Sequence, residues 1–249
     1  MDNNFYNNYS TFESKHWWSL GRRKILIHLL SPYLKNKSYF LDIGCGVGMW
    51  MKEWEDRSII FGIDKYYPFL EKCKSNNLEK VICGLMERLP FKNNTFDCIS
   101  LLDVLEHIDD ENAVLEEVQR IAKPNAIILL TVPALSFLWG NQDIVNYHKR
   151  RYTIGQINSL MQNHSFLIKK ISYYNSILFP LIFAIRIFRR FFLFQPKSNK
   201  DLKSDFEIFN SFGNRLLKNI FSVERYILQY FDLPVGVSII CIACNVKQN

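Results

Sequence analysis

Three glycines at alternating positions are the first residues in this sequence whose spacing indicates chemistry. Gly44, Gly46 and Gly48 follow an apolar run at residues 39–43 and precede residues 49–54, which can begin a helix. A glycine turn between a strand and a helix lets the backbone approach a ligand closely, and the helix N-terminus offers unpaired N–H groups. We therefore expect a cradle for a nucleotide-like ligand at this turn.

The exact glycine spacing bears on which ligand the cradle takes. Nicotinamide and flavin folds prefer G-x-G-x-x-G, and the third glycine of that pattern would fall at Met49. The pattern present is G-x-G-x-G, with Asp42 two residues before the first glycine. A dehydrogenase is therefore disfavoured, and a glycine-rich turn in some other α/β domain stays open as an alternative.

Two segments resemble the motifs of one family. Residues 41–48, L-D-I-G-C-G-V-G, resemble the first motif of class I S-adenosylmethionine-dependent methyltransferases. Residues 96–108, F-D-C-I-S-L-L-D-V-L-E-H-I, resemble a second motif of the same family. The resemblance covers residues 38–175 and 236–246, points to the small-molecule branch of the family, and implies S-adenosylmethionine as the cofactor.

The resemblance also implies which residues contact the cofactor. The glycines form the cradle, Asp42 orders it, and Asp64, at the end of a second apolar run, accepts the ribose hydroxyls; alone, Asp64 would be read as a turn residue. Leu85 replaces an acid that often meets the adenine amino group in the family, so that hydrogen bond is missing or made otherwise. The predicted cofactor-binding residues are Asp42, Gly44, Cys45, Gly46, Asp64, Lys65, Met86, Leu102, Asp103, Trp18 and Arg22.

Two histidines and a tyrosine are the candidates for catalysis. His107 is the penultimate residue of the second motif, and His148 and Tyr152 belong to an H-x-R-R-Y-T segment after the fifth predicted strand. His148 could accept a proton from a hydroxyl or amine, and Tyr152 could supply a hydroxyl. The alternatives are a helix cap for His107 and structural hydrogen bonds or ion pairs for the others. Nothing in the sequence requires a metal ion, so we predict none.

The elements that must position these residues alternate along the chain. Strands followed by helices predict an α/β fold, a Rossmann-like, seven-stranded, mostly parallel sheet with helices on both faces. The family resemblance implies that the seventh strand lies antiparallel beside the fifth. The predicted strands are residues 39–43, 58–64, 80–83, 96–102, 126–132, 166–173 and 236–246, and the predicted helices include 109–122 and 153–164.

We expect one domain over residues 1–249 with two additions. Residues 1–35 form an aromatic-rich helical segment, which either covers the cofactor with Trp18 and Arg22 or packs on the sheet. Residues 175–235 form a helical insertion, in which 177–194 is apolar with three arginines on one helical face. A basic amphipathic helix can lie on an anionic membrane surface. It could equally cover the active site, form a dimer contact, or pack against a second helix.

Composition sets outer limits on location and partners. The formal charge of +7 over 249 residues suggests an anionic partner only weakly. No apolar run reaches the roughly 18 to 20 residues of a membrane span, and residues 1–8 lack a signal-peptide pattern. We predict a cytoplasmic protein, peripheral to the inner face of the membrane if the insertion binds lipid. The six cysteines lie mostly in apolar strands, and the C-x-x-C pair Cys241 and Cys244 is predicted to be reduced, buried and inert rather than a metal site.

The predicted activity is methyl transfer to a small-molecule acceptor. Basic and aromatic loops favour an anionic or partly apolar acceptor, such as a sugar or lipid-linked intermediate of cell-surface polysaccharide or lipid synthesis. One alternative is a protein or nucleic-acid methyltransferase, but no Asn/Asp-Pro-Pro-aromatic motif or nucleic-acid-binding module is apparent, so no nucleic-acid partner is expected. Another is a non-catalytic S-adenosylmethionine-binding or scaffold protein that keeps the fold, which Leu85 alone favours. The oligomeric state stays open.

Overall fold

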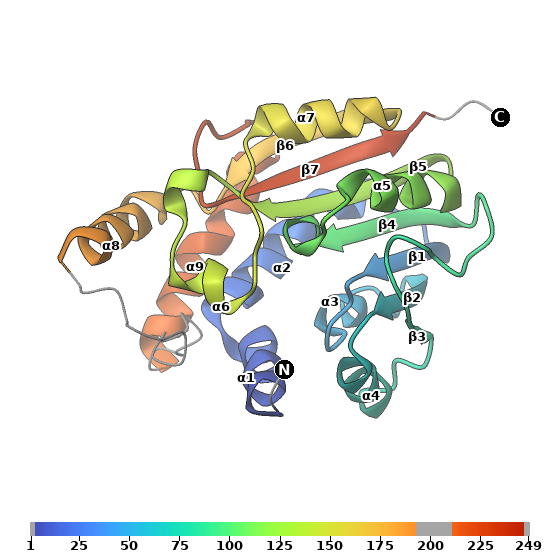
Figure 1. Cartoon of the computed structure of the whole chain (residues 1–249), viewed down its shortest axis with the longest axis horizontal. Helices are drawn as coiled ribbons and strands as arrows, with labels where there is room; N and C mark the ends of the chain where they lie inside the picture. The colour runs from blue at the N-terminus through green and yellow to red at the C-terminus, as the bar shows by residue number, and fades with distance from the viewer. Residues whose placement is uncertain (1–2, 193–210, 247–249) are drawn as a thin grey trace.

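The computed structural model describes residues 3–192 and 211–246, which build one sheet with helices on both faces (Figure 1). The strand order is β3-β2-β1-β4-β5-β7-β6. The first five strands run parallel, and β7 is antiparallel to both of its neighbours. The strands are β1 Ser38–Ile43, β2 Ser58–Asp64, β3 Val81–Cys83, β4 Phe96–Leu102, β5 Ala122–Pro133, β6 Phe166–Tyr174 and β7 Ser238–Asn245. The predicted sheet and its antiparallel strand are confirmed.

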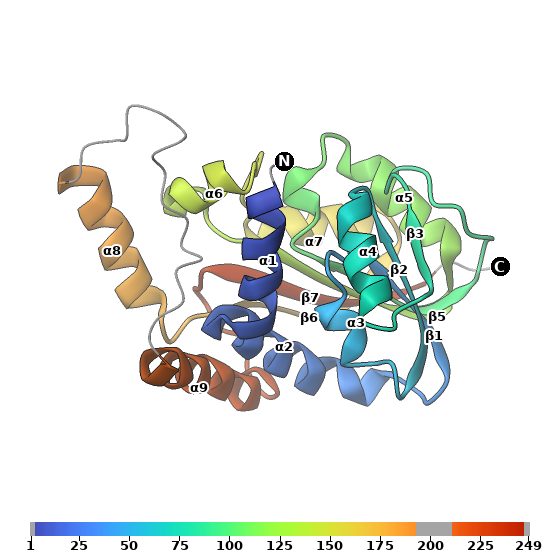
Figure 2. The ribbon, with the colours of Figure 1, turned by 90° about the horizontal axis from the view of Figure 1, so that it is seen from below.

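Helices cover the two faces of the sheet (Figure 2). Side chains from α2, α3, α4 and α9 join one apolar core, and side chains from α5 and α7 join the other. The helices are α1 Asn3–Lys15, α2 Trp17–Leu30, α3 Met49–Lys52, α4 Tyr67–Ser75, α5 Glu111–Ile121, α6 Asn141–Val145, α7 Ile154–Asn163, α8 Phe179–Phe192 and α9 Ser211–Leu228. The short helices α1 and α6 lie near the edge of the sheet where the parallel strands end (Figure 1).

Local sequence explains where several elements begin and end. The Asp110 carboxylate accepts N–H groups of the first turn of α5, and Thr153 with Gln156 forms a capping box on α7. The helix predicted at 109–122 is shorter in the structure, because it begins after its cap Asp110 and β5 already begins at Ala122. The predicted helical segment at 1–35 contains two α-helices, which are separated at His16, where the backbone is extended and the side chain accepts the N–H of Trp18.

The insertion between β6 and β7 is tied to the sheet by a buried acid. The carboxylate of Glu224 in α9 accepts the backbone N–H groups of Asn175, Ser176 and Ile177, each at 2.7 Å. These contacts fix the chain where it leaves β6. The predicted linker at 196–203 and the first part of the predicted helix at 206–230 lie outside the described residues, as do the side chains of Arg189 and Arg190.

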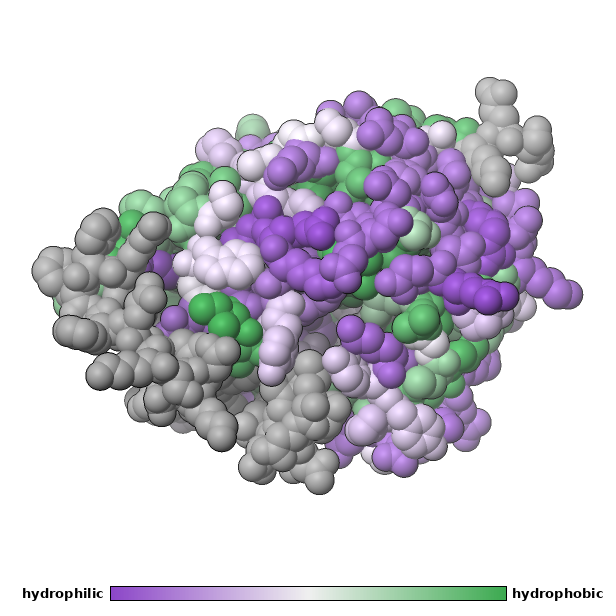
Figure 3. All heavy atoms as spheres, viewed as in Figure 1, coloured by the Kyte–Doolittle hydropathy of each residue, from purple (hydrophilic) through white to green (hydrophobic). Residues whose placement is uncertain are grey.

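The surface differs between the two ends of the molecule. Figure 3 shows mainly hydrophilic side chains over α5 and hydrophobic ones gathered toward α8. On α8 the exposed apolar residues include Leu181, Phe183, Ile185 and Phe188. None of the described helices is long and apolar enough to cross a membrane. All six cysteines are free, and Cys241 and Cys244 are buried as predicted, whereas Cys83 is exposed.

Candidate active site

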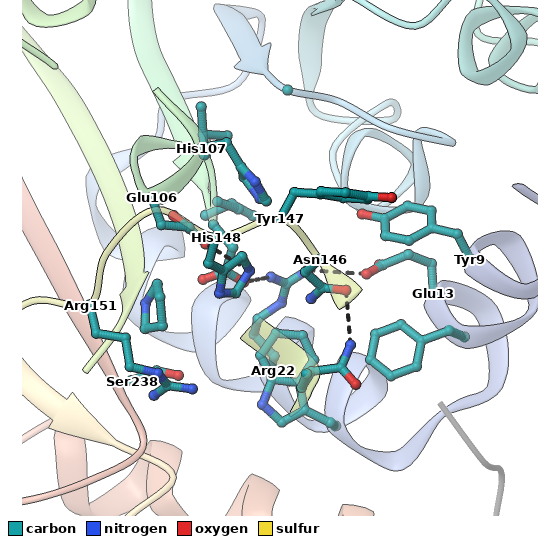
Figure 4. A pocket seen from close by; sticks show the side chains of 18 of the residues that line it. Tyr9, Glu13, Arg22, Glu106, His107, Asn146, Tyr147, His148, Arg151 and Ser238 are labelled. Carbon is teal, nitrogen blue, oxygen red and sulfur yellow. Dashed lines mark hydrogen bonds and ion pairs between the residues drawn. The ribbon is translucent and has the colours of Figure 1, made fainter. Parts of the chain in front are cut away.

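A cavity of about 950 Å³ lies where the parallel strands end (Figure 4). Because carboxyl ends of parallel strands meet at one edge, the loops after β1, β2, β4 and β5 converge on it. The first two helices and the start of α8 complete its wall. Ten predicted residues line it, namely Trp18, Arg22, Gly44, Asp64, Lys65, Met86, Leu102, Asp103, His107 and His148. Four others, Asp42, Cys45, Gly46 and Tyr152, are not part of the lining.

The glycine turn requires residues without side chains. Gly44, Gly46 and Gly48 have φ of 73°, 52° and 79°, a left-handed region that favours glycine. A Cβ at Gly44 would lie 2.6 Å from the Val104 side chain. At Gly46 it would lie 3.3 Å from the ring of Tyr9, so α1 packs directly on the cradle.

Asp64 connects the cradle to the end of β2. Its carboxylate accepts the backbone N–H groups of Gly46 and Tyr66, both at 2.9 Å, while the side chain lines the cavity. A carboxylate has about four lone-pair directions, so it can still accept hydrogen bonds from ribose hydroxyls. Burial raises the pKa of Asp64 above its usual value.

Asp42 and Cys45 lie beneath the cradle and are buried. The Ser100 hydroxyl donates to the Asp42 carboxylate at 2.6 Å, and the Trp50 indole donates to that hydroxyl at 3.1 Å. Burial raises the pKa of Asp42 to about 7, although the Ser100 hydrogen bond opposes the shift. This placement fits the predicted role of ordering the glycine turn better than direct contact with a ligand.

Arg22 connects the N-terminal helices to the end of β4. Its guanidinium donates to the Asp103 carboxylate, lies 3.5 Å from a carboxylate oxygen of Glu13, and lies 4.5 Å from the ring centre of Trp18. Asp103 has a left-handed φ of 56° and also accepts the Thr131 hydroxyl. Burial opposes the charge of Arg22, but the two acids outweigh it and raise its pKa. That Arg22 holds the cofactor carboxylate stays a prediction.

The two predicted histidines meet at the far side of the cavity. The ring centres of His107 and His148 are 4.9 Å apart, and His148 Nε2 lies 3.9 Å from a carboxylate oxygen of Glu106. Burial and the neighbouring His148 lower the pKa of His107 to about 4, so this ring is neutral at physiological pH. Burial, followed by the charge of Asp103, raises the pKa of Glu106.

Asp143 was missed as a site residue and holds His148 in place. Its carboxylate accepts hydrogen bonds from His148 Nδ1 at 2.9 Å and from two Arg151 nitrogens at 2.8 and 3.0 Å. Burial opposes ionisation, yet these hydrogen bonds outweigh it and lower the pKa of Asp143 to about 2. Arg186 of α8 lies 3.7 Å from the same carboxylate. Arg186 therefore faces the site, which favours the prediction that α8 covers it.

The loop arginines and tyrosine make structural contacts. The Tyr152 hydroxyl donates to Glu111, which also lies 3.2 Å from Arg150. Arg151 donates to the carbonyl of Ala134 in addition to Asp143. These contacts join the loop after β5 to α5 and to the end of the sheet. Tyr152 does not line the cavity, so a catalytic role for this residue stays a prediction.

The strand order, the glycine turn and the cavity at the strand ends are those of the class I S-adenosylmethionine-dependent methyltransferase fold. Residues 41–130 match the model of a family described as a methyltransferase domain. A methyltransferase structure from Archaeoglobus fulgidus, titled as S-adenosylmethionine-dependent, aligns with a TM-score of 0.61 at 19% identity, over 95% of this chain and 99% of that chain. The fold is therefore shared along nearly the whole described protein.

Three of the sequence relatives match less than half of this chain. An uncharacterised protein of Methanocaldococcus jannaschii is 36% identical over 108 residues, 43% of this chain and 46% of that protein. Demethylmenaquinone methyltransferase of Lactiplantibacillus plantarum is 27% identical over 123 residues, 45% and 49% of the two chains. The tRNA (carboxymethyluridine(34)-5-O)-methyltransferase of Arabidopsis thaliana is 28% identical over 102 residues, 40% and 25% of the two chains. These alignments span half or less of each relative.

The residues present fit S-adenosylmethionine. At Gly44 a side chain is excluded, so bare backbone faces the cavity. Asp64 stands beside it for the ribose, and Met86 offers an apolar surface for the base. Leu85 is 63% exposed, so it supplies no wall of the cavity and no substitute for the missing acid.

Proposed function

We propose that the protein transfers a methyl group from S-adenosylmethionine to a small-molecule acceptor bound beside His107 and His148. One observation carries the proposal: a single cavity joins the glycine cradle and Asp64 to this histidine pair. One end of the cavity therefore has the groups that suit the cofactor. The other end has groups that can accept a proton.

The chemistry asks little of the protein beyond alignment and proton removal. The cofactor supplies a methyl group on a positively charged sulfur. His148 has Nδ1 fixed by Asp143, which leaves Nε2 as the atom free to accept a proton from an acceptor hydroxyl or amine. His107 is neutral at physiological pH and lies beside it.

The walls of the acceptor end support an anionic or partly apolar molecule. Lys149 and Arg186 contribute positive charge, and Ile182 and Ile185 contribute apolar surface from α8. A sugar or lipid-linked intermediate of cell-surface polysaccharide or lipid synthesis has this combination. The relative named for demethylmenaquinone supports a small-molecule acceptor of partly apolar character.

A tRNA acceptor is the second candidate, because one relative is named as a tRNA methyltransferase. The two candidates are separated by offering the protein radiolabelled cofactor with bulk tRNA or with a total lipid extract. We place the activity in the cytoplasm, with the exposed apolar side chains of α8 as a contact to an anionic membrane surface. Vesicle flotation at low and high salt tests that contact.

Calorimetric titration with S-adenosylmethionine, S-adenosylhomocysteine and NADH tests the cofactor. We expect both sulfur compounds, and not NADH, to bind the wild type, and Asp64→Ala to weaken binding at least tenfold because the ribose loses its acceptor. Asp56→Ala, an exposed acid far from the cavity, is the matched control. Equal affinity of Asp64→Ala and wild type would refute this site, and binding of NADH alone would refute the function.

A further inference from the structure

Glu106 is a fully buried acid whose carboxylate makes no hydrogen bond to a described residue. Its exposed fraction is 0%, and neither carboxylate oxygen has a hydrogen-bond partner among the residues that the structure describes. An ionised carboxylate in such surroundings is costly unless another group compensates it. His148 Nε2 lies 3.9 Å from one of these oxygens, which is too far for a hydrogen bond.

Two imidazoles face the same point as this carboxylate. One ligand atom from each of Glu106, His107 and His148 lies within 4.8 Å of the others, and all three residues line the cavity. The two rings meet edge to face at 77°, so their nitrogens can converge (Figure 4). A metal ion with bonds of about 2.1 Å holds its ligand atoms about 3 to 4 Å apart. Side-chain shifts of about an ångström or less would therefore bring the three ligand atoms within bonding distance of one ion.

The second nitrogen of His148 is held as metal-binding histidines usually are. Such a histidine generally donates its other N–H to a carboxylate, which fixes the ring and its tautomer. His148 Nδ1 lies 2.9 Å from the Asp143 carboxylate, which can only accept, so Nδ1 donates and Nε2 is the nitrogen on the side of Glu106. Two Arg151 nitrogens and the Gly140 N–H hold the carboxylate itself.

We propose that Glu106, His107 and His148 bind one divalent transition-metal ion of the Zn²⁺ class, with an open coordination position toward the cavity. Two imidazole nitrogens and one carboxylate oxygen suit such ions, whereas Mg²⁺ and Ca²⁺ prefer oxygen ligands. Three protein ligands leave a position for water or substrate, as in catalytic zinc sites. The proposal replaces the expectation from sequence that no metal is bound.

The catalytic meaning of the ion rests on the proposed function, in which the bound ion takes over from Nε2 of His148 the task of promoting loss of the acceptor proton. Coordination of an acceptor hydroxyl would lower its pKa, so its proton leaves to solvent. The oxygen lone pair then forms the bond to the methyl carbon while the S–CH₃ electron pair stays on sulfur. The products are the methyl ether and S-adenosylhomocysteine. Metal binding itself does not depend on this step and is measured separately.

Cobalt is the probe, because its visible spectrum reports coordination. The full chain is treated with chelator, dialysed, and titrated with Co²⁺ and then Zn²⁺, for the wild type, Glu106→Gln, His148→Gln and the double variant. His28→Gln is the matched control, since His28 binds Gln229 outside the cavity. Affinity for S-adenosylhomocysteine is measured on each protein as an independent report on the cofactor end.

We expect one cobalt ion per chain in the wild type and His28→Gln, displaced by zinc, and at least tenfold weaker binding in each site variant. Asp143→Asn should weaken binding tenfold or more through the orientation of His148. Metal-free Glu106→Gln should unfold at a higher temperature than the metal-free wild type, because a buried, unpaired acid is removed. Affinity for S-adenosylhomocysteine should stay within about threefold of wild type.

Three results would overturn the proposal. These are no cobalt binding by the wild type, equal binding by the double variant, and an intense thiolate-to-cobalt band that assigns the ion to cysteines. The two hypotheses fail separately. Cobalt binding without binding of S-adenosylhomocysteine would refute the proposed function and leave the metal site standing, and the reverse would refute only the metal site.

Discussion

Asp42 is a carboxylate whose ionisation the folded protein opposes. Its pKa is 3.8 in an ordinary environment and about 7 beneath the glycine turn, because burial disfavours the charge. Between these two values the folded protein binds more protons than the unfolded chain. The free energy of unfolding therefore decreases as pH rises through this interval, by up to about 4 kcal/mol at about 1.4 kcal/mol per pH unit, and is level above it.

The substitution Asp42→Asn removes this titration. We expect the free energy of unfolding of Asp42→Asn relative to wild type to increase between about pH 4 and pH 7, whatever its value at either end. Urea denaturation at several pH values without cofactor measures it, and the exposed Asp56→Asn serves as the matched control. A difference that does not change with pH would show that Asp42 is ionised throughout.

The contact between α2 and α9 depends on a glycine in the middle of a helix. A Cβ at Gly21 would lie 2.5 Å from the ring of Phe221, which is itself packed between Trp17 and Tyr174. Alanine favours a helix over glycine by about 1 kcal/mol, but overpacking a well-filled core costs about 1 to 3 kcal/mol. At this position the steric term should exceed the gain in helix propensity.

Two alanine substitutions separate these terms. We expect Gly21→Ala to destabilise the protein by about 1 to 2 kcal/mol. Gly155→Ala in α7, where the nearest atom to a new Cβ lies 4.0 Å away, should be neutral or stabilise it by up to about 1 kcal/mol. Thermal and urea unfolding compare them. A stabilising Gly21→Ala would mean that α9 moves aside easily and that the insertion is loosely attached.

At the scale of the whole molecule, the first two helices close a cavity whose other walls come from the sheet. Tyr9 lies against the cradle, and Arg22 holds the end of β4 through Asp103. Phe12, Glu13 and other residues of these helices line the same cavity. Cofactor bound beneath them would add contacts to both layers, so its binding energy should also stabilise the closed arrangement of the helices.

We expect S-adenosylhomocysteine to slow amide hydrogen exchange about tenfold or more at residues 9–18 as well as at the glycine turn. Hydrogen–deuterium exchange with mass spectrometry measures both segments. Residues of α7, which lie outside the cavity lining, should exchange at an unchanged rate. Protection of the glycine turn alone would mean that the N-terminal helices pack on the sheet without closing over the cofactor.

Sequence sufficed for the sheet and for much of the cavity lining. Glycine turns and apolar runs mark strand ends, and residues at strand ends converge wherever strands are parallel, so Gly44, Asp64 and Asp103 could be placed together. The antiparallel β7 came from family resemblance, because a buried strand reads the same in either direction. The pattern of apolar residues and the spacing of glycines therefore predict the strands and the edge of the sheet at which their ends meet.

Contacts between distant loops could not be predicted in the same way. Arg22 binds Asp103, which is 81 positions away in the sequence. That Arg22 pairs with an acid of the protein in addition to any contact with the cofactor depends on how α2 lies over β4. The position of His148 near the Glu106 carboxylate depends on the loop after β5, which folds back over the end of the sheet. Tyr152 belongs to that same loop yet binds Glu111, because only the three-dimensional path decides which side chains face inward.

The position of β7 also has a consequence for synthesis of the protein. All eight residues of this strand are buried between β5 and β6, although of the seven described strands it leaves the ribosome last. Until residues 238–245 emerge, the nascent chain presents two unpaired strand edges, which invite pairing with other chains. A message cut short before Ser238 would therefore encode an aggregation-prone product, which chaperones would have to shield during translation.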